Sequence, residues 1–184
     1  LGYVEAGLEL AAQWQESRSK RPARIHVAAG TLGTAAGLAL GLALASENVH
    51  VAGTRITSRI VTNERNLLSL VRGAVRLLEP YATSSLPDPE TVARNVTLVH
   101  DQVGDGYGRA TEAGDAATRQ FADTGLSLDA TYTAKSAAAL LADPLTQQGE
   151  TLFLHTLSSV DPVEVSDEDS MDALPPQIAA RLAR

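Results

Sequence analysis

The chain has 184 residues, of which 44% are hydrophobic and 20% are charged, enough apolar material for one globular core and too little for two. Its formal net charge of -7 argues against a nucleic-acid partner, because contact with a phosphate backbone depends on lysine and arginine. The absence of cysteine excludes disulfides, thiolate nucleophiles and cysteine-ligated metals, and it suits a cytoplasmic protein.

The start of the chain carries no targeting pattern. Residues 1–10 have the spacing of an amphipathic helix and lack the layout of a signal peptide, so we expect Leu1 to follow a longer upstream segment. Between Arg24 and Glu47 the sequence has no Asp, Glu, Lys or Arg, but four glycines interrupt it. The remaining helix is too short to span a bilayer, and we expect no membrane partner.

The first elements alternate between helix and strand. Residues 3–15 are predicted to form a helix that faces a core through Val4, Leu8, Ala11 and Ala12. A short buried strand at 25–29, a glycine-rich turn at 30–33 and a helix at 34–46 follow. A second strand is predicted at 50–56.

The same alternation continues through the middle of the chain. A helix is predicted from Asn63 to residue 78, with an inward stripe made by Leu67, Leu70, Val71, Ala74 and Leu78. Three prolines predict a loop at 79–90, and a third strand follows at 96–100. The helix predicted at 111–123 ends before Gly125.

The last elements complete an α/β pattern. A helix that begins at residue 133 or 135 and reaches 141 precedes a fourth strand at 151–155. An acidic loop and a short helix at 177–182 are predicted after residue 160. Strands separated by helices predict an α/β fold in which a parallel sheet carries helices on both faces.

The turn after the first predicted strand has the composition of an anion site. Residues 29–34 read Ala-Gly-Thr-Leu-Gly-Thr, and the glycines let the backbone turn sharply and approach a ligand. Free amides and the dipole at the start of the following helix favour a phosphate group. Taken alone, the same spacing also fits a simple packing turn.

Five separated segments, in this order, carry a resemblance to one family. They are Gly-Tyr-Val-Glu-Ala at 2–6, the glycine turn at 28–34, Gly-Asp-Gly-Tyr-Gly at 104–108 with Thr-Glu-Ala-Gly at 111–114, Leu-Asp-Ala-Thr-Tyr-Thr-Ala-Lys at 128–135 and Phe-Leu-His-Thr at 153–156. Together they resemble the D-cysteine desulfhydrases and 1-aminocyclopropane-1-carboxylate (ACC) deaminases, which are fold-type-II, tryptophan synthase beta-like pyridoxal phosphate enzymes. The resemblance implies that residues 1–159 form the C-terminal part of such an enzyme domain and that 160–184 form an acidic tail with a short helix.

The resemblance also implies a cofactor site and its residues. The pyridoxal phosphate of the family is held through its phosphate by a loop that corresponds to Gly30, Thr31, Leu32, Gly33 and Thr34. Thr133 corresponds to the residue beside the pyridine nitrogen, while Tyr107 and Tyr132 correspond to tyrosines that face a small amino-acid substrate. Without the family pattern, the two tyrosines could equally be half-buried loop aromatics.

The lysine of this chemistry is missing from the resemblance. The family's Schiff-base lysine belongs to a segment that would precede residue 2, and neither Lys20 nor Lys135 corresponds to it. We therefore expect the chain to supply part of a lyase or deaminase, to be inactive alone, to need the missing N-terminal segment of the same fold, and to form a homodimer.

Several departures from the family pattern keep other functions open. Leu32, Ala134, Leu157 and Ser158 stand where the family has glycine, and Leu32 would need a costly positive φ. The alternative is therefore a degenerate, non-catalytic relative that acts as a binding or structural module. A nucleotide-binding Rossmann domain ranks last, because a full Gly-x-Gly-x-x-Gly motif and a ribose-binding acid are absent. The four histidines lack metal-ligand spacing, and we expect them to be solvated or packed in the core.

Overall fold

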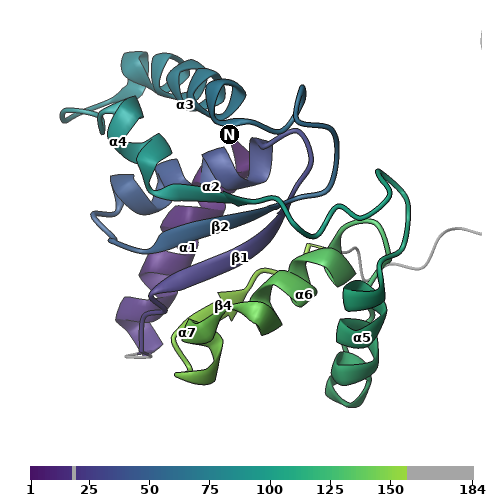
Figure 1. Ribbon diagram of the computed structural model, residues 1–184. Coiled ribbons are helices and arrows are strands. Elements are labelled where there is room, and N and C mark those ends of the chain that lie inside the picture. Colours follow the sequence, from purple (N-terminus) through teal and green to yellow (C-terminus); the bar gives the residue numbers. More distant parts are fainter. Residues whose placement is uncertain (18–19, 157–184) are drawn as a thin grey trace, which may run out of the picture.

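A parallel four-stranded sheet forms the centre of the molecule (Figure 1). The structure is a computed structural model that describes residues 1–17 and 20–156. The strands are β1 (Arg24–Ala29), β2 (His50–Arg55), β3 (Val96–Val99) and β4 (Thr151–Phe153), arranged in the order β3-β2-β1-β4. All three strand pairs are parallel, as the alternation of strands and helices predicts.

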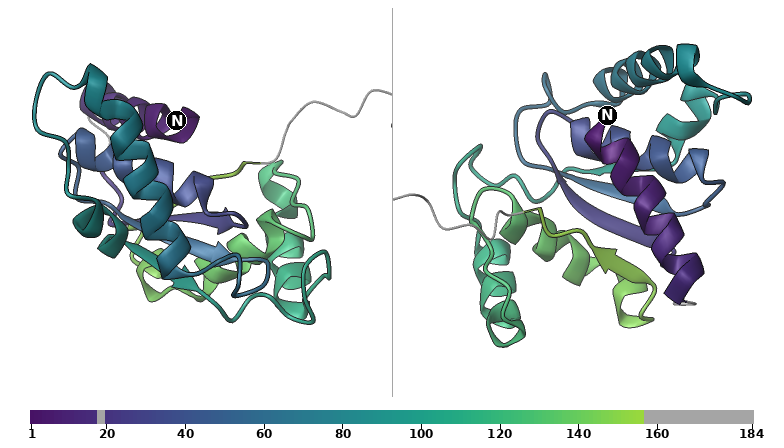
Figure 2. Two further views of the ribbon diagram at one scale, coloured as in Figure 1. Left: turned by 90° about the horizontal axis from the view of Figure 1, so that it is seen from above. Right: turned by 180° about the vertical axis from the view of Figure 1, so that it is seen from behind.

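Helices cover both faces of the sheet (Figures 1 and 2). One face carries α1 (Gly2–Ser17), α2 (Gly33–Leu44), α3 (Glu64–Leu78) and α4 (Pro89–Arg94). The other carries α5 (Glu112–Phe121), α6 (Thr133–Ala142) and α7 (Pro144–Gln147). Two short 3-10 turns, at Glu79–Tyr81 and Ala122–Thr124, follow α3 and α5. The predicted α/β fold class is confirmed.

The main apolar core lies between the sheet and the helices α1 to α4. Strand β1 is central, and its apolar residues Ile25, Val27 and Ala29 are at most 1% exposed, as expected for a strand covered on both faces. Helix α1 packs against α2 at backbone contact, because a Cβ atom added at Gly41 would lie 2.1 Å from the Val4 carbonyl oxygen. A smaller cluster, centred on Ala117 and Ala137, joins α5 to α6.

Three predicted inward positions are wrong. Leu8 on α1 is 43% exposed and Leu70 on α3 is 41% exposed, whereas Gly7 and Val75 are buried on the same helices. At Gly7 the α2 backbone comes too close for a side chain, so the Gly7 side of α1 faces α2 and Leu8 is left exposed. On α3 the buried stripe runs through Leu67, Val71 and Val75 and passes beside Leu70. Ala12 is exposed as well, while its neighbour Ala11 is buried.

Element boundaries follow the predicted ones with two additions. The Asn63 side chain accepts from the Asn66 backbone N–H and caps α3, as predicted. Helices α4 and α7 were not predicted, and each starts with proline after an aspartate cap, Asp88 and Asp143. None of the described helices is long and apolar enough to cross a membrane. The acidic loop and the helix predicted at 177–182 lie outside the described residues.

Candidate functional site

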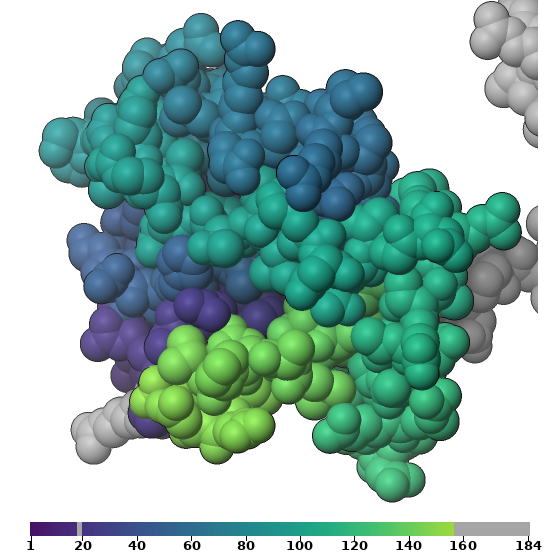
Figure 3. All heavy atoms as spheres, in the orientation of Figure 1, coloured from purple at the N-terminus to yellow at the C-terminus, as the bar shows by residue number. Residues whose placement is uncertain are grey.

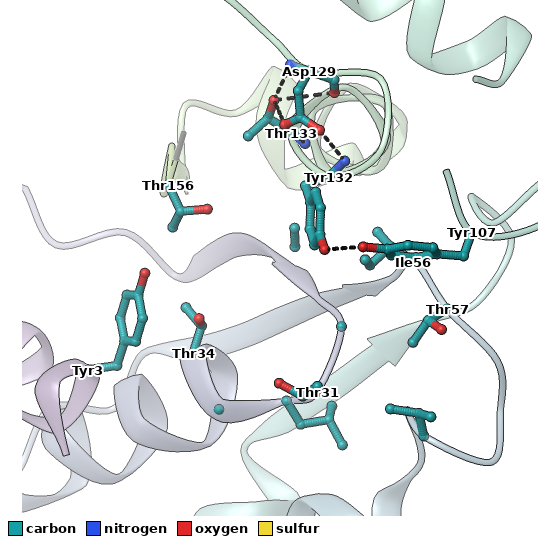
Figure 4. Close-up of a pocket in the computed structure, with 15 residues that line it drawn as sticks. Tyr3, Thr31, Thr34, Ile56, Thr57, Tyr107, Asp129, Tyr132, Thr133 and Thr156 are labelled. Atoms are coloured by element: carbon teal, nitrogen blue, oxygen red, sulfur yellow. Dashed lines mark hydrogen bonds between the residues drawn. The ribbon is translucent and has the colours of Figure 1, made fainter. Parts of the chain in front are cut away.

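The carboxyl ends of the strands open into one cavity of about 780 Å³ (Figure 4). Ligands of open parallel sheets bind at this edge, where the loops that follow the strands meet. The walls come from the turn after β1, the loop after β2, the segment around Tyr107, the start of α6 and the end of β4. The lining residues are Tyr3, Ala28, Gly30, Thr31, Leu32, Gly33, Thr34, Ile56, Thr57, Val61, Tyr107, Asp129, Tyr132, Thr133 and Thr156.

All eight predicted site residues line this cavity. The glycine turn from Gly30 to Thr34 forms one wall, and Tyr107, Tyr132 and Thr133 form the wall that faces it. These groups come from segments about 75 to 100 positions apart in the chain, and the parallel strand order brings them together. Their shared cavity is the arrangement that the resemblance requires.

The first turn of α2 leaves backbone amides unbonded at the cavity. The first helical hydrogen bond runs from Ala36 N to Leu32 O, so the N–H groups of Gly33, Thr34 and Ala35 have no partner within the helix. Leu32, at the N-cap position, provides no side-chain cap. A Cβ atom added at Gly33 would meet nothing within 4 Å, which means that space is open beside these amides. The turn therefore suits an anion such as a phosphate group.

Leu32 occupies the strained position that the sequence predicts. Its φ is 70°, in the left-handed region that glycine adopts freely and other residues adopt at a cost of roughly 1–2 kcal/mol. The side chain is 1% exposed and belongs to the main apolar core. Burial offsets the backbone strain and leaves the cavity side of the turn to the backbone.

The loop after β2 holds the glycine turn in place. The Thr62 hydroxyl donates to the Gly30 carbonyl oxygen at 2.5 Å. Arg55, at the end of β2, donates to the Thr57 carbonyl oxygen at 2.6 Å and to His100 Nδ1 at 2.9 Å. Burial lowers the pKa of Arg55, and the nearby charge of Arg59 adds to this effect. These contacts fix the relative positions of the strand ends that line the cavity.

The two tyrosines form a pair across the mouth of the cavity. Their hydroxyl oxygens are 2.5 Å apart and their rings meet edge to face, with centroids 6.0 Å apart. Tyr107 is 58% exposed and Tyr132 is 39% exposed, so both rings remain accessible. The hydrogen bond with Tyr107 raises the pKa of Tyr132, with desolvation as a second cause. The shared bond uses one of the two phenolic hydrogens, which leaves the other available to a ligand.

Asp129 organises the start of α6, and the sequence analysis did not identify it as a site residue. Its carboxylate accepts from the backbone N–H groups of Thr131, Tyr132 and Thr133 at 2.8 to 3.0 Å. Burial acts to raise the pKa of Asp129, but the hydrogen bonds from Thr133, Tyr132 and Thr131 outweigh it and lower the pKa. The signal that could have revealed this role is an Asp placed before a helix start, in Asp-Ala-Thr-Tyr-Thr.

The hydroxyl of Thr133 is bound to the same carboxylate. It donates to Asp129 Oδ2 at 2.7 Å and accepts from the Asp129 N–H at 2.7 Å. A hydroxyl has one hydrogen and two lone pairs, so these two bonds leave one lone pair free. In this arrangement Thr133 offers a ligand an acceptor. Asp129 is also the one charged side chain among the described residues that line the cavity.

Neither lysine of the chain reaches the cavity. Lys20 pairs with Glu150 at 3.6 Å, at the opposite edge of the sheet. Lys135 is 0% exposed, and its ammonium donates to the carbonyl oxygens of Val103 and Gly106. Burial lowers the pKa of Lys135. The described residues therefore supply the cavity with amides, hydroxyls and one carboxylate, and with no amine.

The histidines have partners within the protein. His26 is buried beside Asp143 at 3.0 Å, and desolvation lowers its pKa despite the opposing effect of that carboxylate. His50 contacts Asn95 and Thr97, His100 accepts from Arg55, and His155 contacts the Ser127 carbonyl oxygen. Within residues 1–17 and 20–156 no cluster of three or more His, Asp or Glu side chains could hold a metal ion.

Comparisons with known proteins identify relatives that align with most of this chain. The family model described as "Pyridoxal-phosphate dependent enzyme" matches residues 1–156. A D-cysteine desulfhydrase of Klebsiella pneumoniae is 32% identical over 162 residues, and one of Salmonella paratyphi B is 31% identical. The crystal structure of an ACC deaminase homologue superposes with a TM-score of 0.64 at 25% identity and covers 83% of this chain.

The match extends over only part of each relative. The aligned region covers 85% of this chain but 45% of either desulfhydrase, and likewise 45% of the ACC deaminase homologue. The chain thus spans less than half the length of the proteins it resembles.

Proposed function

Because the chain belongs to the pyridoxal-phosphate dependent enzyme family, we propose that it supplies the phosphate-binding and substrate-facing half of an amino-acid lyase or deaminase site. The substrate is a small amino acid, as in a D-cysteine desulfhydrase or an ACC deaminase. The observation that carries the proposal is the single cavity shared by the glycine turn, the two tyrosines and Thr133.

The residues present fit the cofactor at its phosphate. The unpaired amides at the start of α2, the open space beside Gly33 and the hydroxyls of Thr31 and Thr34 provide hydrogen-bond donors for a phosphate group. No opposing charge lies on this wall, since the one carboxylate of the described lining belongs to Asp129 on the facing wall. When bound, pyridoxal phosphate supplies an electron sink for the α-carbon of an amino acid.

The facing wall would orient the ring and the substrate. Thr133 would lie beside the pyridine nitrogen, and its free lone pair suits a nitrogen that carries a proton. Asp129 would act through Thr133 by holding the hydroxyl in that orientation. Tyr107 and Tyr132 would bind the substrate and could pass a proton at their phenolic oxygens.

The amine that binds the cofactor aldehyde would come from a segment outside these 184 residues. The absence of a lysine from the described cavity lining motivates this part of the proposal. Joining the chain to the segment that precedes it in the gene should generate the absorbance of a lysine-bound cofactor. A colourless complex that is indifferent to phosphate would contradict the proposed function.

A single substitution tests the phosphate wall in the chain alone. Gly33→Asp places a carboxylate in the open space beside the free amides, where it competes with phosphate and repels it. We expect the affinity for pyridoxal phosphate, measured by equilibrium dialysis with inorganic phosphate as competitor, to fall by about tenfold to a hundredfold. Gly73→Asp is the matched control, because Gly73 lies on α3 with equally open surroundings. Equal affinities in the two variants would refute the assignment of the phosphate wall.

The alternative function is a binding or structural module that has lost the chemistry. The strained Leu32 at a position where the family has glycine favours it. In that case Gly33→Asp would leave the weak affinity for pyridoxal phosphate unchanged, while the joined protein would still assemble. The same measurements therefore separate the two functions.

A further inference from the structure

Lys135 is a buried amine that the proposed function does not use. It is the largest fully buried side chain of the described residues and lies in the first turn of α6. Its Nζ atom donates to Val103 O at 2.7 Å and to Gly106 O at 3.1 Å. Removing an ammonium group from water costs several kcal/mol unless hydrogen bonds replace the lost hydration, so these two carbonyls are essential partners.

The two acceptors belong to the turn formed by residues 103–108, which carries Tyr107 and is called the Tyr107 turn below. Gly104, Gly106 and Gly108 all have positive φ, at 61°, 137° and 73°. The turn lies outside the sheet and the helices, so no strand ladder or helical hydrogen bonds fix its shape. Figure 3 shows the atoms of this segment lying directly against those of α6. The two hydrogen bonds from Lys135 on α6 therefore contribute directly to holding the turn in place.

We propose that Lys135 is a positioning residue that holds the Tyr107 turn in place and thereby keeps the Tyr107 hydroxyl on that of Tyr132. Both anchors of the turn lie within one helical turn of each other, Lys135 inside α6 and Tyr132 immediately before it. The buried amine fixes the backbone, and the phenol pair is the result at the cavity. The meaning of this arrangement for substrate rests on the proposed function, but the coupling itself does not require the cofactor.

The pKa of Tyr132 gives a direct measurement of the coupling. The shared hydrogen bond raises this pKa, so a spectrophotometric titration should show a tyrosine ionisation above the ordinary tyrosine range that belongs to Tyr132. A neutral lysine amine keeps two N–H donors, so Lys135 can serve both carbonyls at the high pH of the experiment. Tyr107→Phe removes the shared bond and defines the titration of an uncoupled Tyr132.

Lys135→Met keeps an unbranched side chain that is one atom shorter and removes the hydrogen-bond donors. We expect the late tyrosine ionisation to return to the position seen in Tyr107→Phe, and the double variant to show no further change. Lys20→Met is the control, because Lys20 is exposed at the opposite edge of the sheet and should leave the titration unchanged. An unaltered Tyr132 pKa in folded Lys135→Met protein would overturn the proposal.

A second variant keeps the test decisive if Lys135→Met does not fold. Gly106→Ala leaves Lys135 intact and strains the turn, because alanine rarely adopts a φ of 137°. The added methyl group would meet no neighbouring atom, so the strain comes from the backbone alone. It should release Tyr107 and lower the Tyr132 pKa, whereas Gly125→Ala, at a positive-φ glycine outside the turn, should not. Equal titrations of these two variants would also overturn the proposal.

Cleavage by trypsin after Arg109 provides an independent readout. Arg109 directly follows the turn, and its backbone N–H donates to Gly106 O. Lys135→Met removes the hydrogen bonds between the ammonium group and this turn. The variant should therefore open more often here than the natural chain, and trypsin should cleave it after Arg109 about tenfold faster or more. A chain that shows this coupling but binds no pyridoxal phosphate would refute the proposed function and leave the role of Lys135 standing.

Discussion

Two helices, α2 and α6, begin at the same cavity but treat their backbone amides in opposite ways. At α2 the N-cap residue is Leu32, which offers no side-chain acceptor, and the first amides remain without a partner in the helix. At α6 the Asp129 carboxylate accepts three backbone N–H groups. The amides at the start of α6 are already bonded to the Asp129 carboxylate, whereas the amides at the start of α2 remain available to a bound anion. One wall of the cavity therefore carries a negative charge and the facing wall carries free N–H donors.

Removing the carboxylate from α6 should produce the largest change in stability. Asp129→Ala leaves three amides without their acceptor and frees the Thr133 hydroxyl, so we expect the free energy of unfolding to fall by about 2–3 kcal/mol. Urea denaturation measures this loss. Asp105→Ala, at an exposed aspartate, is the matched control and should change stability by less than about 0.5 kcal/mol. A similar loss in both variants would mean that Asp129 does not stabilise the start of α6.

The start of α2 should respond to its backbone conformation as well as to its side chain. Leu32→Ala loses buried apolar contact and keeps a strained φ, while Leu32→Gly loses the contact and relieves the strain. Both should be less stable than the natural chain, and the glycine variant should be the more stable of the two by about 1 kcal/mol. Thermal unfolding of the pair decides this point, and a more stable alanine variant would contradict the left-handed geometry at Leu32.

The smallest expected effect is on the pH dependence of the free energy of unfolding, which should differ between the starts of α6 and α2. The pKa of Asp129 is lowered in the folded chain, so its contribution is present above the unfolded pKa of aspartate and is lost as pH falls through the folded pKa. Asp129→Asn should therefore reduce the loss of stability on acidification. Acid titrations of unfolding in both proteins measure the difference, and identical acid profiles would show that Asp129 is not linked to folding. The start of α2 contains no titratable group and should contribute no such dependence.

The sequence predicts the sheet better than it predicts the contact faces of the helices. The strands are short apolar runs bounded by glycine or polar residues, and the two central strands, β1 and β2, are buried on both faces. Leu8 and Leu70 show the limit for helices, since an apolar residue at helical spacing can still face water, as Leu8 does where the adjacent Gly7 lets α2 approach closely. Proline misled in one place, because Pro89 starts α4 instead of extending the loop before it.

Part of the site was also accessible from sequence. The order of the motifs predicted that the glycine turn, the tyrosines and Thr133 lie at one cavity, and the structure has them there. The positive φ expected at Leu32 is also present. Asp129 and Tyr3 lie within the family-like segments 128–135 and 2–6 but were assigned no role there, and Thr57 lies outside all five segments. Whether the predicted residues bind pyridoxal phosphate stays a prediction for the experiments above.

The bond between the two phenols sets a condition on any molecule that enters beneath it. The two oxygens lie 2.5 Å apart and use one of the two phenolic hydrogens, so the other hydrogen can be donated to a ligand without breaking the pair. We expect a ligand with a single acceptor to leave the pair intact, whereas a ligand that takes both hydroxyls as donors has to replace the bond between them.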